Sequence, residues 1–169
     1  METTVRLYSP TYRETRTYLT AALFIAGNII LPQLCHTIPQ GGLIFLPIYF
    51  FTLISACKYG WQVGLLTALL SPMVNHLLFG MPPAHALLPI TVKSVALAFS
   101  ASLIGRRHDT VTILSVAAAV VAYQLVGSLF EWVMTGSLAA AIQDMSLGLP
   151  GIMLQIFGGY AVLRWLLCR

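Results

Sequence analysis

Long apolar segments follow one another along almost the whole chain and are separated by short polar breaks. Each apolar run is close to the roughly 20 residues that a helix needs to cross the hydrocarbon core of a bilayer. The breaks, at residues 39–42, 60 and 80–83 among others, contain the glycine and proline of turns. The runs are continuously apolar rather than alternating, which argues against membrane-spanning strands. The pattern predicts six transmembrane helices, at residues 17–34, 42–57, 61–80, 85–104, 110–133 and 147–167.

Composition agrees with this interpretation. Of the 169 residues, 58% are hydrophobic and only 8% are charged, whereas a soluble domain carries about 25% charged residues. We therefore predict an all-α, polytopic membrane protein that forms one domain over residues 1–169. The polar start of the chain, which holds Arg6, Arg13 and Arg16, is not typical of a cleaved secretory leader, so the first apolar run is expected to be a retained helix.

The basic residues mark one side of the predicted bundle. Eight of the nine lie before the first span, after the second, after the fourth, or at the end of the sixth. They are Arg6, Arg13, Arg16, Lys58, Arg106, Arg107, Arg164 and Arg169. Because basic connections stay in the cytoplasm, both ends of the chain are predicted to be cytoplasmic and the protein to lie in the cytoplasmic (inner) cell membrane. Their expected partners are anionic lipid headgroups, not nucleic acid.

The ninth basic residue, Lys93, falls well inside the fourth predicted span. A charge at that depth costs at least about 2.5–3.5 kcal/mol and needs a partner or a water-filled cavity. Two interpretations remain open: a contact with a bound ligand, or an internal ion pair with Glu131 or Asp144. Both can hold in turn if a substrate replaces the internal partner.

Further polar residues come from several helices but fall at a similar depth, in the outer half of the bundle. Singly, each is typical of interhelical hydrogen bonding or of the membrane interface. Jointly they predict a binding cavity that is open to the outside. The predicted substrate-binding residues are His36, Gln40, Asn75, His76, His85, Lys93, Gln124, Glu131 and Gln155.

Catalytic and metal-binding motifs are missing from the sequence. Cys35, His36, His76 and His85 raise the alternative of a metal or metallocofactor, because cysteine and imidazole suit soft and borderline metals, but their spacing matches no known motif. Neither lysine belongs to a phosphate-binding loop, and the chain holds no H-E-x-x-H or G-x-S-x-G. No metal site, cofactor or catalytic residue is predicted, and the chain is expected not to be an enzyme.

Several short strings in the first two-thirds of the chain resemble those of one transporter family. They are HTIPQGG at 36–42, FLP at 45–47, KYG at 58–60, SP at 71–72 and FGMPP at 79–83. Together with six helices, cytoplasmic ends and an outer polar site, they resemble the substrate-binding S component of an energy-coupling factor (ECF) transporter. The last two helices match only in general character.

The resemblance implies a function and partners. An S component binds a vitamin or related micronutrient at its outer face and docks on a membrane T component that carries two cytoplasmic ATPases. Ala22 and Ala26, a small-xxx-small pair in the first helix, would then belong to the docking face. The first outer connection, with His36 and Gln40, would cover the ligand, and the later helices would supply pocket residues such as Lys93, Glu131 and Gln155.

Ligand and mechanism stay open at this point. Lys93 favours an anionic or acceptor-rich molecule, whereas Glu131 in the same cavity would allow a zwitterion or a donor-rich ring. Two other classes of protein also remain: a stand-alone carrier or channel, and an intramembrane enzyme or assembly factor.

Overall fold

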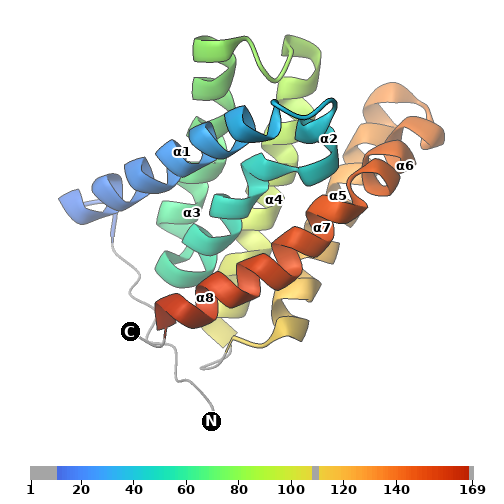
Figure 1. The fold of residues 1–169 in the computed structure, drawn as a ribbon. Coiled ribbons are helices and arrows are strands. Elements are labelled where there is room, and N and C mark those ends of the chain that lie inside the picture. Colours follow the sequence, from blue (N-terminus) through green and yellow to red (C-terminus); the bar gives the residue numbers. More distant parts are fainter. Residues whose placement is uncertain (1–10, 108–110, 168–169) are drawn as a thin grey trace.

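The computed structural model describes residues 11–107 and 111–167, and all regular structure within these ranges is helical. The prediction of an all-α fold is therefore confirmed for the described residues. The elements, shown in Figure 1, are α1 (Thr15–Cys35), α2 (Gly41–Phe45), η1 (Pro47–Tyr49), α3 (Phe50–Phe79), α4 (Ala84–Arg107), α5 (Ile113–Thr135), α6 (Leu138–Leu147), α7 (Leu149–Met153), η2 (Leu154–Gly158) and α8 (Gly159–Leu167).

Five described segments are long and apolar enough to cross a membrane. They are Thr15–Cys35, Pro47–Phe79, Ala84–Gly105, Ile113–Thr135 and Leu149–Leu166. Their outer faces present large apolar side chains, including Leu23, Leu77 and Leu114. Water would not favour so extensive an apolar surface, so these helices are suited to lipid, as expected of a multi-pass membrane protein.

The helix α3 reverses direction at Gly60. This residue has φ +79° and ψ −171°, a conformation that is open to glycine and closed to other residues. In a straight helix Thr52 and Ser71 would lie about 28 Å apart. Instead, one atom of α1, Asn28 Nδ2, donates to the hydroxyls of both, at 3.0 and 3.1 Å. The two arms of α3 are therefore antiparallel neighbours, drawn in teal and green in Figure 1.

Small residues and a buried amide hold this hairpin together. A Cβ at Gly64 would lie 2.6 Å from the Cβ of Ala56, so the arms meet at nearly backbone distance. Asn28 Oδ1 accepts the backbone N–H of Phe51 at 3.2 Å, and the Asn28 carbonyl accepts from Asn75 Nδ2 at 2.9 Å. Because the side chain of Asn28 bonds to both arms, it ties α1 to the hairpin as interhelical hydrogen bonds do in other membrane proteins.

The predicted spans and the observed helices differ in three places. The predicted span 42–57 is interrupted at Leu46, which is left-handed (φ 46°, ψ 47°) and precedes Pro47, a position that avoids helical backbone. The predicted span 147–167 contains a π-helical turn, Leu154–Gly158. Finally, α6 lies where a connection was expected; its 10 residues are too few to cross a bilayer, so a search for spans does not detect it.

The ends of the helices gather at two opposite ends of the bundle. Lys58 Nζ donates to the Leu166 carbonyl at 3.1 Å, which places the Gly60 reversal beside the end of α8. Figure 1 shows the end of α4 and the start of α5 on this same side, with the α1–α2 connection, the α3–α4 turn and α6 away from it. The prediction of six separate spans, which counts the two arms of α3 as two spans, stays a prediction. The prediction that both chain ends are cytoplasmic also stays a prediction.

Candidate functional site

A cavity of about 620 Å³ lies at the end of the bundle remote from Gly60. Its wall is formed by the last turn of α1, the α1–α2 connection, α2, η1, the second arm of α3, the α3–α4 turn and the start of α4. A volume of this size falls in the range of small-molecule sites. Four of the nine predicted substrate-binding residues line the wall: His36, Gln40, Asn75 and His85.

Two glycines shape the α1–α2 side of this cavity. Gln40 is left-handed (φ 58°, ψ 12°) and turns the chain back toward α1. A Cβ at Gly41 would overlap the carbonyl oxygen of Cys35, and a Cβ at Gly42 would lie 2.8 Å from His36 Nε2. The absence of side chains at both positions therefore lets the turn approach α1 and lets the His36 ring lie against the start of α2.

The opposite side of the cavity is the turn between α3 and α4. Gly80 ends α3 in a left-handed conformation (φ 68°), and Met81, Pro82 and Pro83 then form part of the wall. His76 Nδ1 lies 2.7 Å from the Pro82 carbonyl. Because a carbonyl can only accept, Nδ1 carries the hydrogen. His76 thus supports the turn and is not itself one of the lining residues.

Asn75 is the most buried polar residue of the wall, with 2% of its surface exposed. Its Nδ2 donates to the carbonyls of Asn28, at 2.9 Å, and Ser71, at 3.1 Å. Its Oδ1 is buried and has no hydrogen-bond partner in the described part of the chain. An unpaired buried acceptor costs about 1–3 kcal/mol. The other such atom, Ser128 Oγ, does not belong to this cavity.

The remainder of the wall is mostly apolar, and no Asp, Glu, Lys or Arg lines it among the residues that the structure describes. An apolar wall with a few convergent polar groups is typical of small-molecule sites. Several apolar and amide residues of the wall are not among the substrate-binding residues predicted from the sequence, although Ile38, Pro39 and Pro47 belong to the strings that resemble the transporter family. They are Pro32, Gln33, Ile38, Pro39, Leu43, Pro47, Ile48, Ala86 and Ile90.

Lys93 lies elsewhere, between α4 and α5. Its Nζ is 2.7 Å from Glu131 Oε2, with Lys93 1% exposed and the Glu131 side chain 19% exposed. Gly127 makes room for the lysine, since a Cβ there would lie 2.6 Å from Lys93 Cε and closer still to Cγ. Of the two interpretations left open by the sequence, the structure shows the ion pair with Glu131. A ligand contact at Lys93 stays a prediction.

Two of the three predicted glutamines, Gln124 and Gln155, are also buried inside the bundle. Gln124 shares a face of α5 with Gly127 and Glu131. Gln155 lies in the π-helical turn, where its Oε1 accepts from the Tyr123 hydroxyl at 2.9 Å and its Nε2 donates to the Leu46 carbonyl at 3.5 Å. Neither residue lines the cavity. Gln155 instead connects α5 to the left-handed break after α2.

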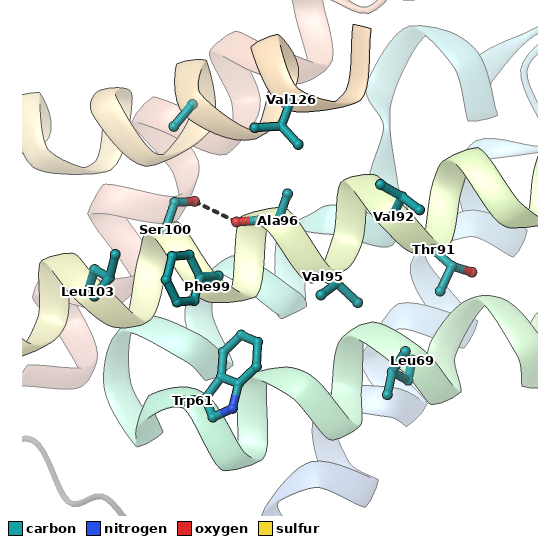
Figure 2. A pocket seen from close by; sticks show the side chains of 11 residues that line it. Trp61, Leu69, Thr91, Val92, Val95, Ala96, Phe99, Ser100, Leu103 and Val126 are labelled. Carbon is teal, nitrogen blue, oxygen red and sulfur yellow. Dashed lines mark hydrogen bonds between the residues drawn. The ribbon is translucent and has the colours of Figure 1, made fainter. Parts of the chain in front are cut away.

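A second cavity, of about 820 Å³, opens between the second arm of α3, α4 and α5 (Figure 2). Trp61 and Phe99 meet edge to face in it, with ring centroids 5.6 Å apart. Its two hydroxyls are satisfied within α4: Thr91 donates to the Leu87 carbonyl and Ser100 to that of Ala96, the bond drawn in Figure 2. This wall offers apolar contact and would not select a polar solute.

The remaining predicted features lie outside both cavities. Ala22 and Ala26 are exposed on α1, on the side opposite the buried residues Phe24 and Asn28. Their docking role stays a prediction. No group of three or more His, Cys, Asp or Glu side chains in residues 11–107 and 111–167 is arranged to hold a metal ion. Asp144, the alternative partner of Lys93, has a side chain outside the described set.

Models of protein families, curated proteins and solved structures were each compared with the chain, and none of the three gave a match.

Proposed function

We propose that this chain is the membrane-embedded binding subunit of an importer, and that it captures a small molecule in the cavity lined by Asn75, His36, Gln40 and His85. One observation carries the proposal: Asn75 lines a cavity of small-molecule size, and its Oδ1 is a buried acceptor without a partner among the described residues. Buried polar groups in native proteins are nearly always paired, and exceptions need an explanation. A bound molecule that donates a hydrogen bond to this oxygen would satisfy it.

The orientation of the cavity supports uptake from outside. With six crossings, in which the two arms of α3 each count as one, the cavity lies at the end remote from Lys58 and Arg164. Positive residues favour the cytoplasmic side, so the cavity would open outward and both chain ends would lie inside. The expected ligand is a vitamin or related micronutrient, as the resemblance to ECF S components implies.

Partner proteins would supply the energy, since the sequence has no ATP-binding loop. We infer docking on an ECF T component that carries two cytoplasmic ATPases. The exposed pair Ala22 and Ala26 supports this, because small residues let a second helix approach α1 closely. A stand-alone carrier would use the same cavity without any ATPase, and this difference can be measured.

Retention of a small molecule tests the binding function. The protein would be purified gently from cells grown in rich medium and analysed by native mass spectrometry. A stoichiometric small molecule supports a binding subunit. A protein that carries none, in repeated preparations that remain folded, contradicts it.

Copurification tests the partners. A tagged chain should bring down a T component and ATPases from its own cells, and Ala26→Trp should abolish this. The matched control is Leu114→Trp, which adds the same ring to an outward face of α5, where Leu114 is 78% exposed. Equal recovery with both variants would exclude the α1 face as the docking surface, and transport without any ATPase would favour a stand-alone carrier.

Cysteine labelling tests the orientation. The background variant lacks Cys35, Cys57 and Cys168, and single cysteines are introduced at the exposed positions Thr37 and Arg164. An impermeant maleimide should label Thr37→Cys on intact cells and Arg164→Cys only after permeabilisation. The reverse pattern would overturn the proposed orientation.

A further inference from the structure

The chemistry of the cavity wall restricts the class of molecule that it can take; this inference rests on the proposed binding function. We propose that the cavity takes a molecule that is uncharged at neutral pH, mostly apolar in surface, and that donates an N–H or O–H group to Asn75 Oδ1. The sequence alone left anionic or acceptor-rich molecules, zwitterions and donor-rich rings open.

The hydrogen bonds of Asn75 determine which of its amide atoms is left for a bound molecule. Nδ2 faces two backbone carbonyls, those of Asn28 and Ser71, and both can only accept. Rotating the amide by half a turn would place Oδ1 against these two oxygens and remove both hydrogen bonds. The orientation is therefore fixed, and the unpaired atom is an acceptor. Only a donor can satisfy it.

The surrounding hydrogen bonds hold this acceptor rigidly. Asn28, which holds Asn75 through its carbonyl, is itself fixed by its bonds to Thr52, Ser71 and the Phe51 N–H. A group whose orientation is set before binding loses little conformational entropy when the complex forms. Asn75 Oδ1 is thus positioned to discriminate between a molecule with a donor and the same molecule without it.

The side chains of the cavity wall also restrict the charge of the molecule. A charge moved into a largely apolar cavity needs an opposite charge nearby. The described wall supplies no carboxylate, ammonium or guanidinium group, and the buried lysine that the sequence suggested for this role, Lys93, is paired with Glu131 outside the wall. The polar remainder of the wall consists of two imidazoles and two primary amides besides Asn75, which can donate to and accept from neutral groups. They are His36, His85, Gln33 and Gln40.

The test uses two compounds. One is the molecule that copurifies with the protein, and the other is its derivative in which a methyl group replaces the donor hydrogen. Once mass spectrometry has identified that molecule, both compounds are titrated against the wild type, Asn75→Ala and Ser71→Ala. Ser71→Ala is the matched control: it perturbs the same buried network, but it keeps the Ser71 carbonyl and leaves Asn75 Oδ1 in place.

We expect the copurified compound to be uncharged. We also expect it to bind the wild type and Ser71→Ala at least about tenfold more tightly than its methylated derivative binds them, and this factor corresponds to about 1.4 kcal/mol. Asn75→Ala should bind the two compounds equally. An anionic or zwitterionic compound, or undiminished discrimination in Asn75→Ala, would overturn the proposed ligand class and leave the binding function standing. A wild-type protein that retains no molecule would overturn both. The wild-type comparison decides the question even if Asn75→Ala does not fold.

Discussion

The Lys93–Glu131 pair allows a quantitative prediction for the variant Glu131→Gln. Lys93 lies nine residues from the start of α4, about 14 Å along the helix axis, and about 21 Å from its end at Arg107. Its ammonium group is buried against α5 and is 2.7 Å from the carboxylate. Loss of one partner of a buried ion pair costs about 3–5 kcal/mol because an uncompensated charge remains. Glutamine can still accept a hydrogen bond and Glu131 is partly exposed, so we expect about 3 kcal/mol.

The measurement is the free energy of unfolding in mixed detergent micelles, followed by tryptophan fluorescence during titration with a denaturing detergent. The control is the double variant Lys93→Met with Glu131→Gln, which removes both charges. Replacing a whole buried pair is often close to neutral, so the double variant should recover most of the loss. The single variant Lys93→Met is measured as well. If the losses of unfolding free energy in Glu131→Gln and in Lys93→Met add up to the loss in the double variant, the ion pair does not stabilise the fold and the reasoning fails.

Three further predictions follow from other contacts. Gly60→Ala should destabilise the protein by about 1–3 kcal/mol, because its backbone conformation excludes a side chain; Gly158→Ala, where a Cβ meets only ordinary contacts, is the control, and equal thermal shifts would contradict the expectation. Tyr123→Phe should cost about 1–3 kcal/mol in the same unfolding assay, since the Gln155 oxygen would lose its donor; no change would mean that this bond contributes nothing. Gly41→Ala should reduce retention of the copurified molecule by moving the α1–α2 turn away from α1, and full retention would show that the turn tolerates the change.

Much of the helical framework could be predicted from the sequence, because hydropathy reports which segments suit lipid. The reversal at Gly60 was predicted from a single glycine beside Lys58, and the structure places it there. Hydropathy does not locate the interruption after α2, because it depends on a left-handed Leu46 before Pro47 rather than on a change in polarity.

The candidate site could be predicted only in part, because depth along a helix does not give the direction in which a side chain points. His36, Gln40, Asn75 and His85 line one cavity, as depth suggested. Gln155 was placed in the same layer, but the π-helical turn around it directs its amide to Tyr123 and the Leu46 carbonyl. Periodicity of an ideal α-helix cannot anticipate such a turn.

The close contact between the arms of α3 has a consequence for sequence variation among homologues. Ala56 and Gly64 share a space that has no room for one additional methyl group. A larger residue at one of the two positions would therefore require the arms to separate or the side chain at the other position to become smaller. Gly64 has no side chain to lose, so only Ala56 can become smaller. We expect the two positions to accept only small residues, and to vary in opposite directions where they vary at all. Such a size correlation between positions eight apart would be unexpected in a straight helix, so it would identify the hairpin from an alignment alone.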